Sequence, residues 1–184
     1  TMEGGMRVPM IARLPGVIPA QSVCSEMTTT MDLLPTIGAL TRAKLPKRVI
    51  DGRDISSLLR GDPGAKSPHE VFYYYRRRQL QAIRWGNWKW HLPLASTYPR
   101  WNDPNVKEKG RPGKLIDLKS DLREQVDVTT RNPDVIVKMK ALADQAVEKL
   151  GDAGSQGLEQ RPSRNLKQSV PLVMRQVSEI EDER

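Results

Sequence analysis

Few residues of this 184-residue chain have the types and spacing that catalysis needs. It contains two histidines, His69 and His91, and one cysteine, Cys24. A single cysteine permits neither an intrachain disulfide nor a cysteine-based metal cluster. The sequence also has no G-x-S-x-G elbow, no P-loop, no H-E-x-x-H and no G-x-G-x-x-G. We therefore expect that this chain by itself is not a complete enzyme.

The composition is basic, with a formal net charge of +8. Such a charge favours nucleic acid or membrane surfaces when it is concentrated in one patch. Here it is spread along the chain, Arg76–Arg78 is the only run of three, and the C-terminus is acidic. One alternative stays open, in which Tyr73–Arg78 and Trp88 bind single-stranded nucleic acid. No apolar run approaches the ~18–20 residues of a membrane span, and no signal peptide is recognisable. We expect no nucleic acid partner and no membrane span.

All nine aromatic residues lie between Phe72 and Trp101. Aromatic side chains bury the largest areas, so the C-terminal half must fold around this window. Three runs in the window have strand composition or alternate apolar and polar residues: Val71–Tyr75, Leu80–Arg84 and Asn87–Leu92. Gly86 lies in a tight turn between the last two runs. The sequence predicts an antiparallel meander.

The last run of the meander separates two kinds of side chain. Successive side chains of a strand point to opposite faces of the sheet. Trp88, Trp90 and Leu92 therefore share one face, while Lys89 and His91 share the other.

The clearest helix is predicted at Asn132–Leu150. Asn132 suits the N-cap, Pro133 suits the first helical position, and Gly151 ends the helix. Its apolar stripe consists of Val135, Met139, Leu142, Ala146 and Leu150. We expect this stripe to cover one face of the meander.

The N-terminal third is predicted to contain one strand and two helices. Val8–Leu14 has the composition of a short buried strand, at the edge of a larger sheet whose other strands are not in this chain. Thr30–Lys44 is predicted to be an amphipathic helix whose first turn is bent, or whose start is moved later, by Pro35. The expected apolar face of that helix consists of Met31, Leu34, Ile37 and Leu40. A shorter helical turn is expected at Asp54–Leu59, closed by Gly61.

The remaining segments are mostly polar. Pro93–Pro112 is predicted to be a long surface loop, and Lys114–Leu118 a further strand. We expect Gly154–Arg184 to be extended or poorly ordered, with a short turn near Val170–Val177.

Six blocks of the sequence follow the order found in one enzyme family. They are Glu3–Gly16 (E-G-G-x-R-x-P-x-I-x-x-x-P-G), Thr30–Thr36 (D-L-x-P-T), Leu45–Gly61 (L-P and D-G-x-D-x-x-x-L-L-x-G), Phe72–Tyr74 (F-x-Y), Ala82–Lys89 (A-x-R-x-G-x-W-K) and Leu115–Glu124 (L-x-D-L-x-x-D-x-x-E). Together they resemble the sulfatases, the arylsulfatase-type enzymes of the alkaline-phosphatase-like superfamily. Leu122 departs from the pattern, since proline is usual there.

The resemblance implies an α/β fold of the alkaline-phosphatase type, of which this chain would be the C-terminal portion. Residues 1–66 would be the end of the catalytic α/β domain, with the edge of the large mixed sheet and its helices. Residues 67–151 would be a small C-terminal subdomain, an antiparallel sheet packed on helix 132–150. Residues 152–184 would form an extended or poorly ordered tail.

The resemblance also implies a reaction that this chain does not complete. Sulfatases hydrolyse sulfate esters with a formylglycine nucleophile, made from Cys or Ser in a C/S-x-P-x-R motif, and with a divalent metal, usually calcium. Neither Cys24 nor Ser96 has the proline that this motif requires. The late catalytic lysine of the family precedes the Glu3 block and lies outside the chain. No catalytic residue and no metal ligand is therefore carried over.

The expected contribution of this chain is to substrate binding, because the small C-terminal sheet of the family flanks the active-site cleft. His91 matches a position where relatives often carry histidine, and Arg76 offers a cation to a sulfated or carboxylated group. The simpler alternatives are an ordinary strand histidine and a solvated hairpin end. Arg77 and Arg78 depart from the family's Tyr-Arg-Gly. Arg7 is expected to form a structural ion pair, and Cys24 to be half-buried without a role.

The expected partner of the intact enzyme is a sulfated small molecule or glycan, and a periplasmic or secreted location fits the family. A phosphatase or phosphonate hydrolase of the same superfamily stays open as an alternative, because the nucleophile that distinguishes them lies upstream.

Overall fold

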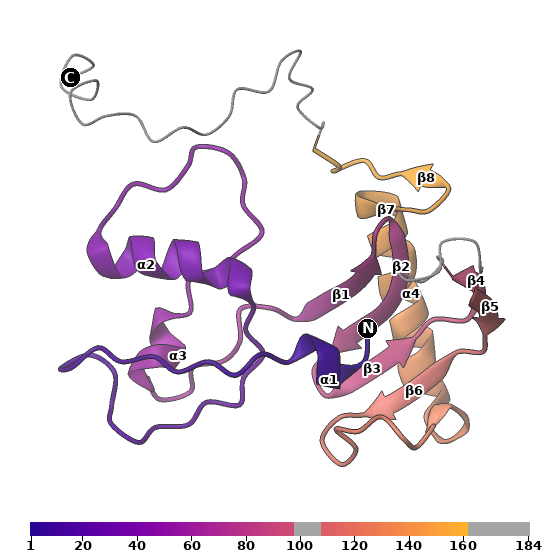
Figure 1. Cartoon of the computed structure of the whole chain (residues 1–184), viewed down its shortest axis with the longest axis horizontal. Coiled ribbons are helices and arrows are strands. Elements are labelled where there is room, and N and C mark those ends of the chain that lie inside the picture. Colours follow the sequence, from indigo (N-terminus) through magenta and orange to yellow (C-terminus); the bar gives the residue numbers. More distant parts are fainter. Residues whose placement is uncertain (98–107, 162–184) are drawn as a thin grey trace.

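The computed structural model describes residues 1–97 and 108–161. A four-stranded antiparallel sheet lies in the C-terminal half, in the order β1-β2-β3-β6 (Figure 1). Its strands are β1 (Val71–Arg76), β2 (Gln79–Trp85), β3 (Trp88–His91) and β6 (Lys114–Asp117). The predicted meander is therefore confirmed, with β6 as the added strand beside β3. Gly86 has φ of 56° in the turn between β2 and β3, a backbone conformation that glycine adopts without strain.

Helix α4 (Pro133–Leu150) covers one face of this sheet. The core between them consists of Leu80, Ile83, Trp90, Leu115, Met139, Leu142, Ala143 and Ala146. Most of the predicted helix stripe is confirmed, whereas Leu150 at its end is 37% exposed. Asn132 occupies the N-cap position, but its side chain donates to the Val128 carbonyl and does not cap the helix.

The opposite face of the sheet is covered by the chain's beginning and by the loop that carries Glu124. The short helix α1 (Glu3–Met6) lies over this face, as Figure 1 shows. The Glu3 amide donates to the Glu124 carboxylate across 121 residues of sequence. The tryptophan side of β3 therefore faces α4, and the Lys89 and His91 side faces α1, as the alternation predicted.

Two small hairpins extend the C-terminal half. Strand β4 (Leu94–Thr97) pairs with β5 (Glu108–Arg111), so the prediction of an unbroken loop at Pro93–Pro112 is wrong at both of its ends. The polar, proline-containing composition of this segment is typical of a loop, but Pro, Lys and Gly residues are also tolerated in a two-stranded edge ribbon. Strand β7 (Gly151–Asp152) pairs with β8 (Ser155–Gln156) after α4. The turn predicted at Val170–Val177 lies outside the described residues.

The N-terminal half contains a short 3-10 turn, η1 (Thr30–Asp32), followed by α2 (Leu33–Thr41) and α3 (Ser56–Arg60). Pro35 is the third residue of α2, so the α-helix starts later than Thr30, as its proline predicted. The expected apolar face of α2 is not buried, however: Leu34 is 53% and Ile37 is 56% exposed. The buried residues of α2 are instead Pro35, Thr36 and Gly38.

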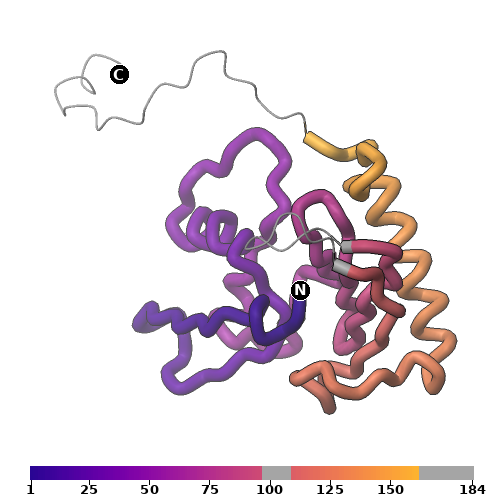
Figure 2. Tube along the Cα trace, turned by 45° about the vertical axis from the view of Figure 1, so that its right-hand side comes forward, coloured from indigo at the N-terminus to yellow at the C-terminus, as the bar shows by residue number. Residues whose placement is uncertain are grey.

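The strand predicted at Val8–Leu14 is not formed. This segment runs away from the sheet as an extended trace, which Figures 1 and 2 show from two directions. A strand requires a neighbour that pairs with its backbone. Within residues 1–97 and 108–161 no such neighbour lies beside it. Over the same ranges, no helix is long and apolar enough to cross a membrane.

Candidate functional site

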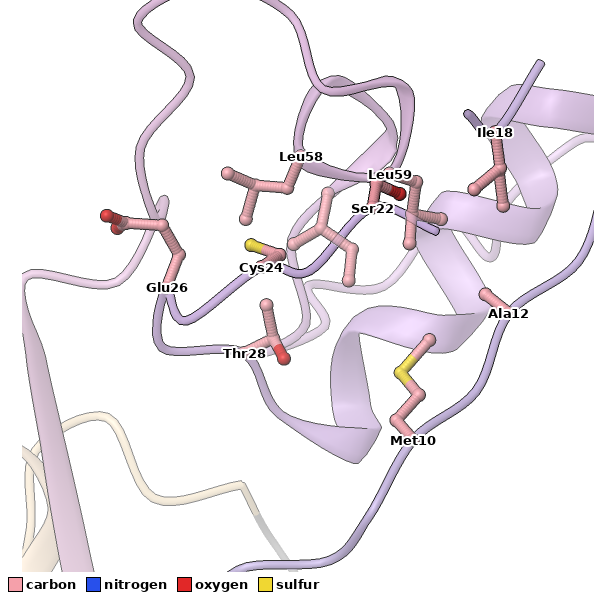
Figure 3. Close-up of a pocket in the computed structure, with 10 residues that line it drawn as sticks. Met10, Ala12, Ile18, Ser22, Cys24, Glu26, Thr28, Leu58 and Leu59 are labelled. Carbon is pink, nitrogen blue, oxygen red and sulfur yellow. The ribbon is translucent and has the colours of Figure 1, made fainter. Parts of the chain in front are cut away.

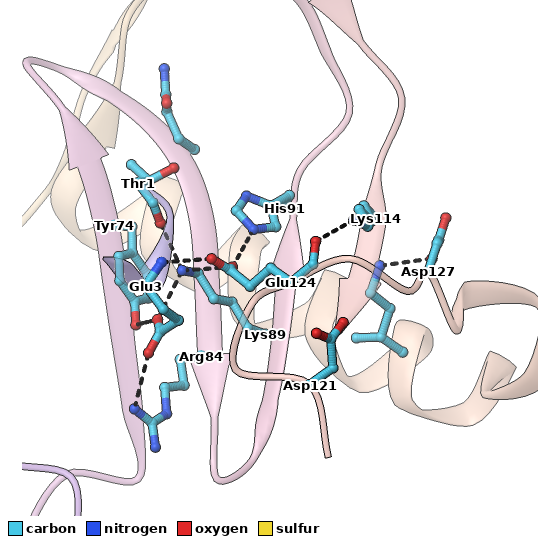
Figure 4. Close-up of polar contacts among 12 residues, drawn as sticks. Thr1, Glu3, Tyr74, Arg84, Lys89, His91, Lys114, Asp121, Glu124 and Asp127 are labelled. Carbon is cyan, nitrogen blue, oxygen red and sulfur yellow. Dashed lines mark hydrogen bonds and ion pairs between the residues drawn. The ribbon is translucent and has the colours of Figure 1, made fainter. Parts of the chain in front are cut away.

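A group of buried charges lies between α1 and the sheet, and Lys89 is at its centre (Figure 4). Strand β3 places this side chain on the face opposite the tryptophans, where it is fully buried. Its ammonium lies 2.8 Å from Glu3 Oε1 and 3.0 Å from Glu124 Oε1, and it donates to the Thr1 carbonyl at 2.7 Å. The ammonium also lies 4.3 Å from the centre of the Tyr74 ring. A buried lysine is stable here because two carboxylates compensate its charge.

Glu3 is held by several donors at once. Arg7 Nε donates to its Oε2 at 2.7 Å, and the Tyr74 hydroxyl donates to its Oε1 at 3.0 Å. Burial by itself would raise the pKa of Glu3, but hydrogen bonds from Lys89 and Arg7 outweigh burial and hold the pKa at about 2. Burial and the charge of Glu3 raise the pKa of Tyr74 well above its usual value of 10. The prediction that Arg7 forms a structural ion pair is confirmed.

His91 is 4% exposed and lies next to this group. Its Nε2 is 2.7 Å from Glu124 Oε1. Burial lowers the pKa of His91, and the nearby charge of Lys89 lowers it further, against the opposing effect of Glu124. The imidazole is therefore neutral near pH 7, and its Nε2 carries the proton because a carboxylate only accepts. Nδ1 is then a hydrogen-bond acceptor.

Arg76 is half-buried at the end of β1, where it pairs with Gln79 in the sheet register. Its charge reaches Thr1, so the structure brings Arg76 to the end of the sheet at which Thr1 lies. Whether His91 or Arg76 contacts a substrate stays a prediction.

Arg111 was not predicted to lie near this site. Arg111 is the last residue of β5 in the β4–β5 hairpin, and its guanidinium donates a hydrogen bond to the Gln81 carbonyl at 2.9 Å. The charge of Arg111 also lowers the pKa of His91, after burial and the closer Lys89. Because a loop was predicted in place of this hairpin, no sequence pattern indicated that Arg111 lies near His91.

A second buried carboxylate, Asp32, organises the N-terminal half. It is fully buried and accepts hydrogen bonds from the Thr29 amide at 2.7 Å, the Arg53 amide at 2.8 Å and His69 Nε2 at 2.7 Å. Burial would raise its pKa, but these donors outweigh burial and lower it. His69 therefore has a structural partner, and its ring is bound to Asp32 as the ring of His91 is bound to Glu124.

Cys24 lies at the edge of a cavity of about 160 Å³ between residues 10–28 and α3 (Figure 3). Met10 and Ala12 line one side, and Leu58 and Leu59 line the other. Cys24 is exposed, and not half-buried as predicted. It has Ser22 and Glu26 as polar neighbours in the lining, without a histidine that would activate a thiol.

The described residues do not fit a metal site. Over residues 1–97 and 108–161, no group of three His, Cys, Asp or Glu side chains lies close enough to hold an ion. The buried carboxylates Glu3, Glu124 and Asp32 are already satisfied by cations and backbone amides.

The family model "C-terminal region of aryl-sulfatase" matches residues 67–173, more than half of the chain. The chain belongs to the sulfatase family. Mouse steryl-sulfatase is 48% identical over 86 residues, which are 46% of this chain and 14% of that protein. Human arylsulfatase A is 42% identical over 158 residues, which are 77% of this chain and 31% of that protein. The chain thus spans less than a third of the length of these relatives and corresponds to their C-terminal part.

Solved sulfatase structures show the same fold. The PsFucS1 sulfatase from Pseudoalteromonas sp. superimposes with a TM-score of 0.56 at 22% identity, over 72% of this chain and 28% of that one. The resemblance seen in the six sequence blocks is therefore confirmed, as is a C-terminal segment of mixed α/β structure with a small antiparallel sheet and a C-terminal helix.

The buried charges have a signal in those blocks of the sequence. Glu3, Asp32, Lys89 and Glu124 are all letters of the family blocks. A charged residue that lies among apolar residues in a strand, or at the start of a helix, is expected to have a polar or charged partner when it is buried.

Proposed function

We propose that this chain is the C-terminal part of a sulfatase that hydrolyses a sulfate ester of a small molecule or glycan. The match of residues 67–173 to the C-terminal region of aryl-sulfatase carries this proposal. The formylglycine nucleophile and the divalent metal, usually calcium in this family, would come from residues outside the chain. The metal would polarise the sulfate in the intact enzyme.

His91 and Arg76 are the substrate contacts that we propose within this chain. Because His91 is neutral and its Nε2 is bonded to Glu124, its Nδ1 would accept a hydrogen bond from a substrate hydroxyl. Its part is therefore to orient the substrate, and not to neutralise sulfate. The Arg76 guanidinium suits an anionic group of the substrate.

The packing of the aromatic residues argues against the nucleic-acid alternative. Trp90 belongs to the core, and Tyr73, Tyr75, Trp85 and Trp88 pack against it. A surface that binds single strands needs aromatic faces open to stacking bases. We therefore expect the purified chain to show no salt-dependent binding of oligonucleotides.

The gene sequence upstream of Thr1 tests the proposal directly. We expect a C/S-x-P-x-R motif there, in frame with this chain. A lone Thr or Ser in the corresponding place would instead support the phosphatase or phosphonate hydrolase. A second test uses the purified chain with a generic aryl sulfate and calcium. We expect no metal-dependent turnover, and such turnover would contradict the absence of a nucleophile from this chain.

A further inference from the structure

The segment that joins α2 to α3 carries a group of positive charges. Residues 42–48, RAKLPKR, are called the basic loop below. Its four cations, all of them exposed, are Arg42, Lys44, Lys47 and Arg48. No acidic residue occurs between Thr41 and Ile50. So dense a group of lysine and arginine in a short segment is typical of surfaces that bind polyanions.

The four cations of the basic loop make no ion pair within residues 1–97 and 108–161. Other exposed cations of those ranges do have partners: Arg60 pairs with Asp62 at 2.7 Å, and Arg161 pairs with Asp51 at 2.6 Å. Asp51 is the first carboxylate after the basic loop in the sequence, and it is thus engaged by a cation from a distant segment. The charge of the basic loop is therefore open to an external anion.

The basic loop is held at both ends. At its start, Arg42 has φ of 59° and its amide donates to the Gly38 carbonyl, which ends α2. Leu45 packs on Gly38, where an added Cβ would lie 2.7 Å from Leu45 Cδ2. Beyond the loop, Gly52 lies against the Met31 carbonyl, and the trace arches over α2 between these two points (Figure 1). A loop anchored in this way loses little backbone entropy when it binds a ligand.

The number of cations indicates a polymeric ligand. One sulfate ester carries one negative charge, which a single guanidinium or ammonium already matches. Four cations along seven residues match a ligand that repeats its anion. A sulfated polysaccharide has this property, whereas a small sulfated molecule does not. The proposed function leaves the choice between these two substrate classes open, and the basic loop favours the polysaccharide.

Two other polyanions fit the basic loop less well. Proteins that bind single-stranded nucleic acid stack its bases on aromatic side chains. All nine aromatic residues lie between Phe72 and Trp101, outside the loop. Stable binding to a membrane surface needs an amphipathic helix, or a lipid anchor beside the basic residues. The basic loop contains no helix, and Pro46 lies within it.

We propose that the basic loop binds a sulfated polysaccharide through Arg42, Lys44, Lys47 and Arg48. The inference rests on the proposed function for the choice of a sulfated polymer among polyanions, and it names a polymeric glycan as the substrate class. Because the basic loop belongs to the N-terminal half, the polymer would contact the protein outside the sheet face that carries His91.

The experiment measures binding of the purified chain to heparin, used as a sulfated polysaccharide, by isothermal titration calorimetry. We expect binding that weakens as salt is raised, because the bound cations displace counter-ions from the polymer. Lys47→Gln/Arg48→Gln should lower the affinity at least about tenfold, since each cation beside an anionic surface contributes to binding. Lys47→Arg keeps the charge and should bind as the parent chain does.

The matched control is Lys138→Gln/Lys140→Gln, which removes the same charge from the exposed side of α4 and should change the affinity little. Circular dichroism shows whether each variant folds as the parent chain does. Equal losses in the two double variants would overturn the proposal, because binding would then follow net charge and not the basic loop. A parent chain that does not bind heparin would overturn it as well.

Two further ligands test the choice of polyanion. A single-stranded oligonucleotide that binds through the basic loop as tightly as heparin would overturn the proposal. Vesicles of anionic phospholipid that bind through this loop more tightly than heparin would do the same. We expect both ligands to bind more weakly than heparin at the same salt concentration.

Binding and activity can fail independently. Heparin binding that depends on Lys47 and Arg48, in a chain without an upstream C/S-x-P-x-R motif, would uphold the polysaccharide site and count against the proposed function. An upstream motif without heparin binding would do the reverse.

Discussion

The ammonium of Lys89 lies 2.8 Å from Glu3 Oε1, although 86 residues separate them and both side chains are almost completely buried. This pair joins the start of the chain to the middle of the sheet. Glu124 binds the same ammonium from the other side and the Glu3 amide as well. The three residues therefore fix three distant segments against one another.

Replacing Lys89 with methionine should destabilise the chain by roughly 3–5 kcal/mol, because two buried carboxylates lose their counter-charge. The free energy of unfolding from urea titration measures this. Lys138→Met is the matched control, since Lys138 is exposed and only lies over the Trp85 ring at 5.8 Å. Adding Glu3→Gln to Lys89→Met should recover part of the loss. Equal effects of the two lysine variants would show that the buried pair contributes nothing.

Acid should destabilise the chain over the pH range in which Glu3 becomes protonated. Its pKa falls from the usual 4.5 to about 2 on folding. A group with a lowered folded pKa contributes stability above its unfolded pKa and loses it as pH falls through the folded pKa. Stability should therefore decline as pH drops from 4.5 toward 2, with Asp32 and Glu124 contributing in the same direction. Urea midpoints measured down this pH range test it; the Glu3→Gln chain should show a shallower decline, and an unchanged slope would remove Glu3 as a cause.

Replacing Asp32 with alanine should loosen the N-terminal half and leave the sheet intact. Three hydrogen bonds to one carboxylate are lost, at a cost of roughly 2–4 kcal/mol. Limited proteolysis should then cut between Thr30 and Gly61 more quickly, while tryptophan fluorescence stays that of the parent chain. Asp144→Ala, on the exposed side of α4, is the control. Protection equal to that of the parent would mean that Asp32 does not hold this half together.

Gly52 cannot accept even a methyl group where it stands. A Cβ there would lie 1.9 Å from the Met31 carbonyl oxygen. Gly52→Ala must therefore push the 51–54 segment away from η1 and break the Arg53–Asp32 hydrogen bond, with a loss of about 2 kcal/mol or more. Gly4→Ala, where a Cβ meets nothing within 4 Å, should be neutral. Thermal unfolding of the two variants compares them, and similar midpoints would show that the backbone relaxes freely.

Sequence patterns predicted the local features of the C-terminal half well. Alternation along β3 predicted that Trp90 lies on one face and Lys89 and His91 on the other, as the structure shows. The cap residues around Asn132 and Gly151 gave the bounds of α4 to within one residue. These features depend on neighbours in sequence, so a single stretch contains the whole signal.

The partners of the buried charges could not be predicted in this way. Nothing near Lys89 in the sequence indicates that Glu3 and Glu124 close around it, since the pairing arises only when α1 and the Glu124 loop meet on the sheet. The spacing of apolar residues predicted an apolar face on α2, but Ile37 on that face is exposed. Such a pattern shows which residues share a face, and it does not show what covers that face. The β4–β5 hairpin was not predicted because Thr97 is the only β-branched residue of its strands and none of them is aromatic.

The pairing of Glu3 with Lys89 also imposes an order on biosynthesis. Glu3 leaves the ribosome 86 residues before Lys89 and 121 residues before Glu124. Until both have been made, the first turn of the chain lacks the groups that neutralise its carboxylate and bind its amide. Glu3 can therefore reach its final position only after the segment that carries Glu124 has been made.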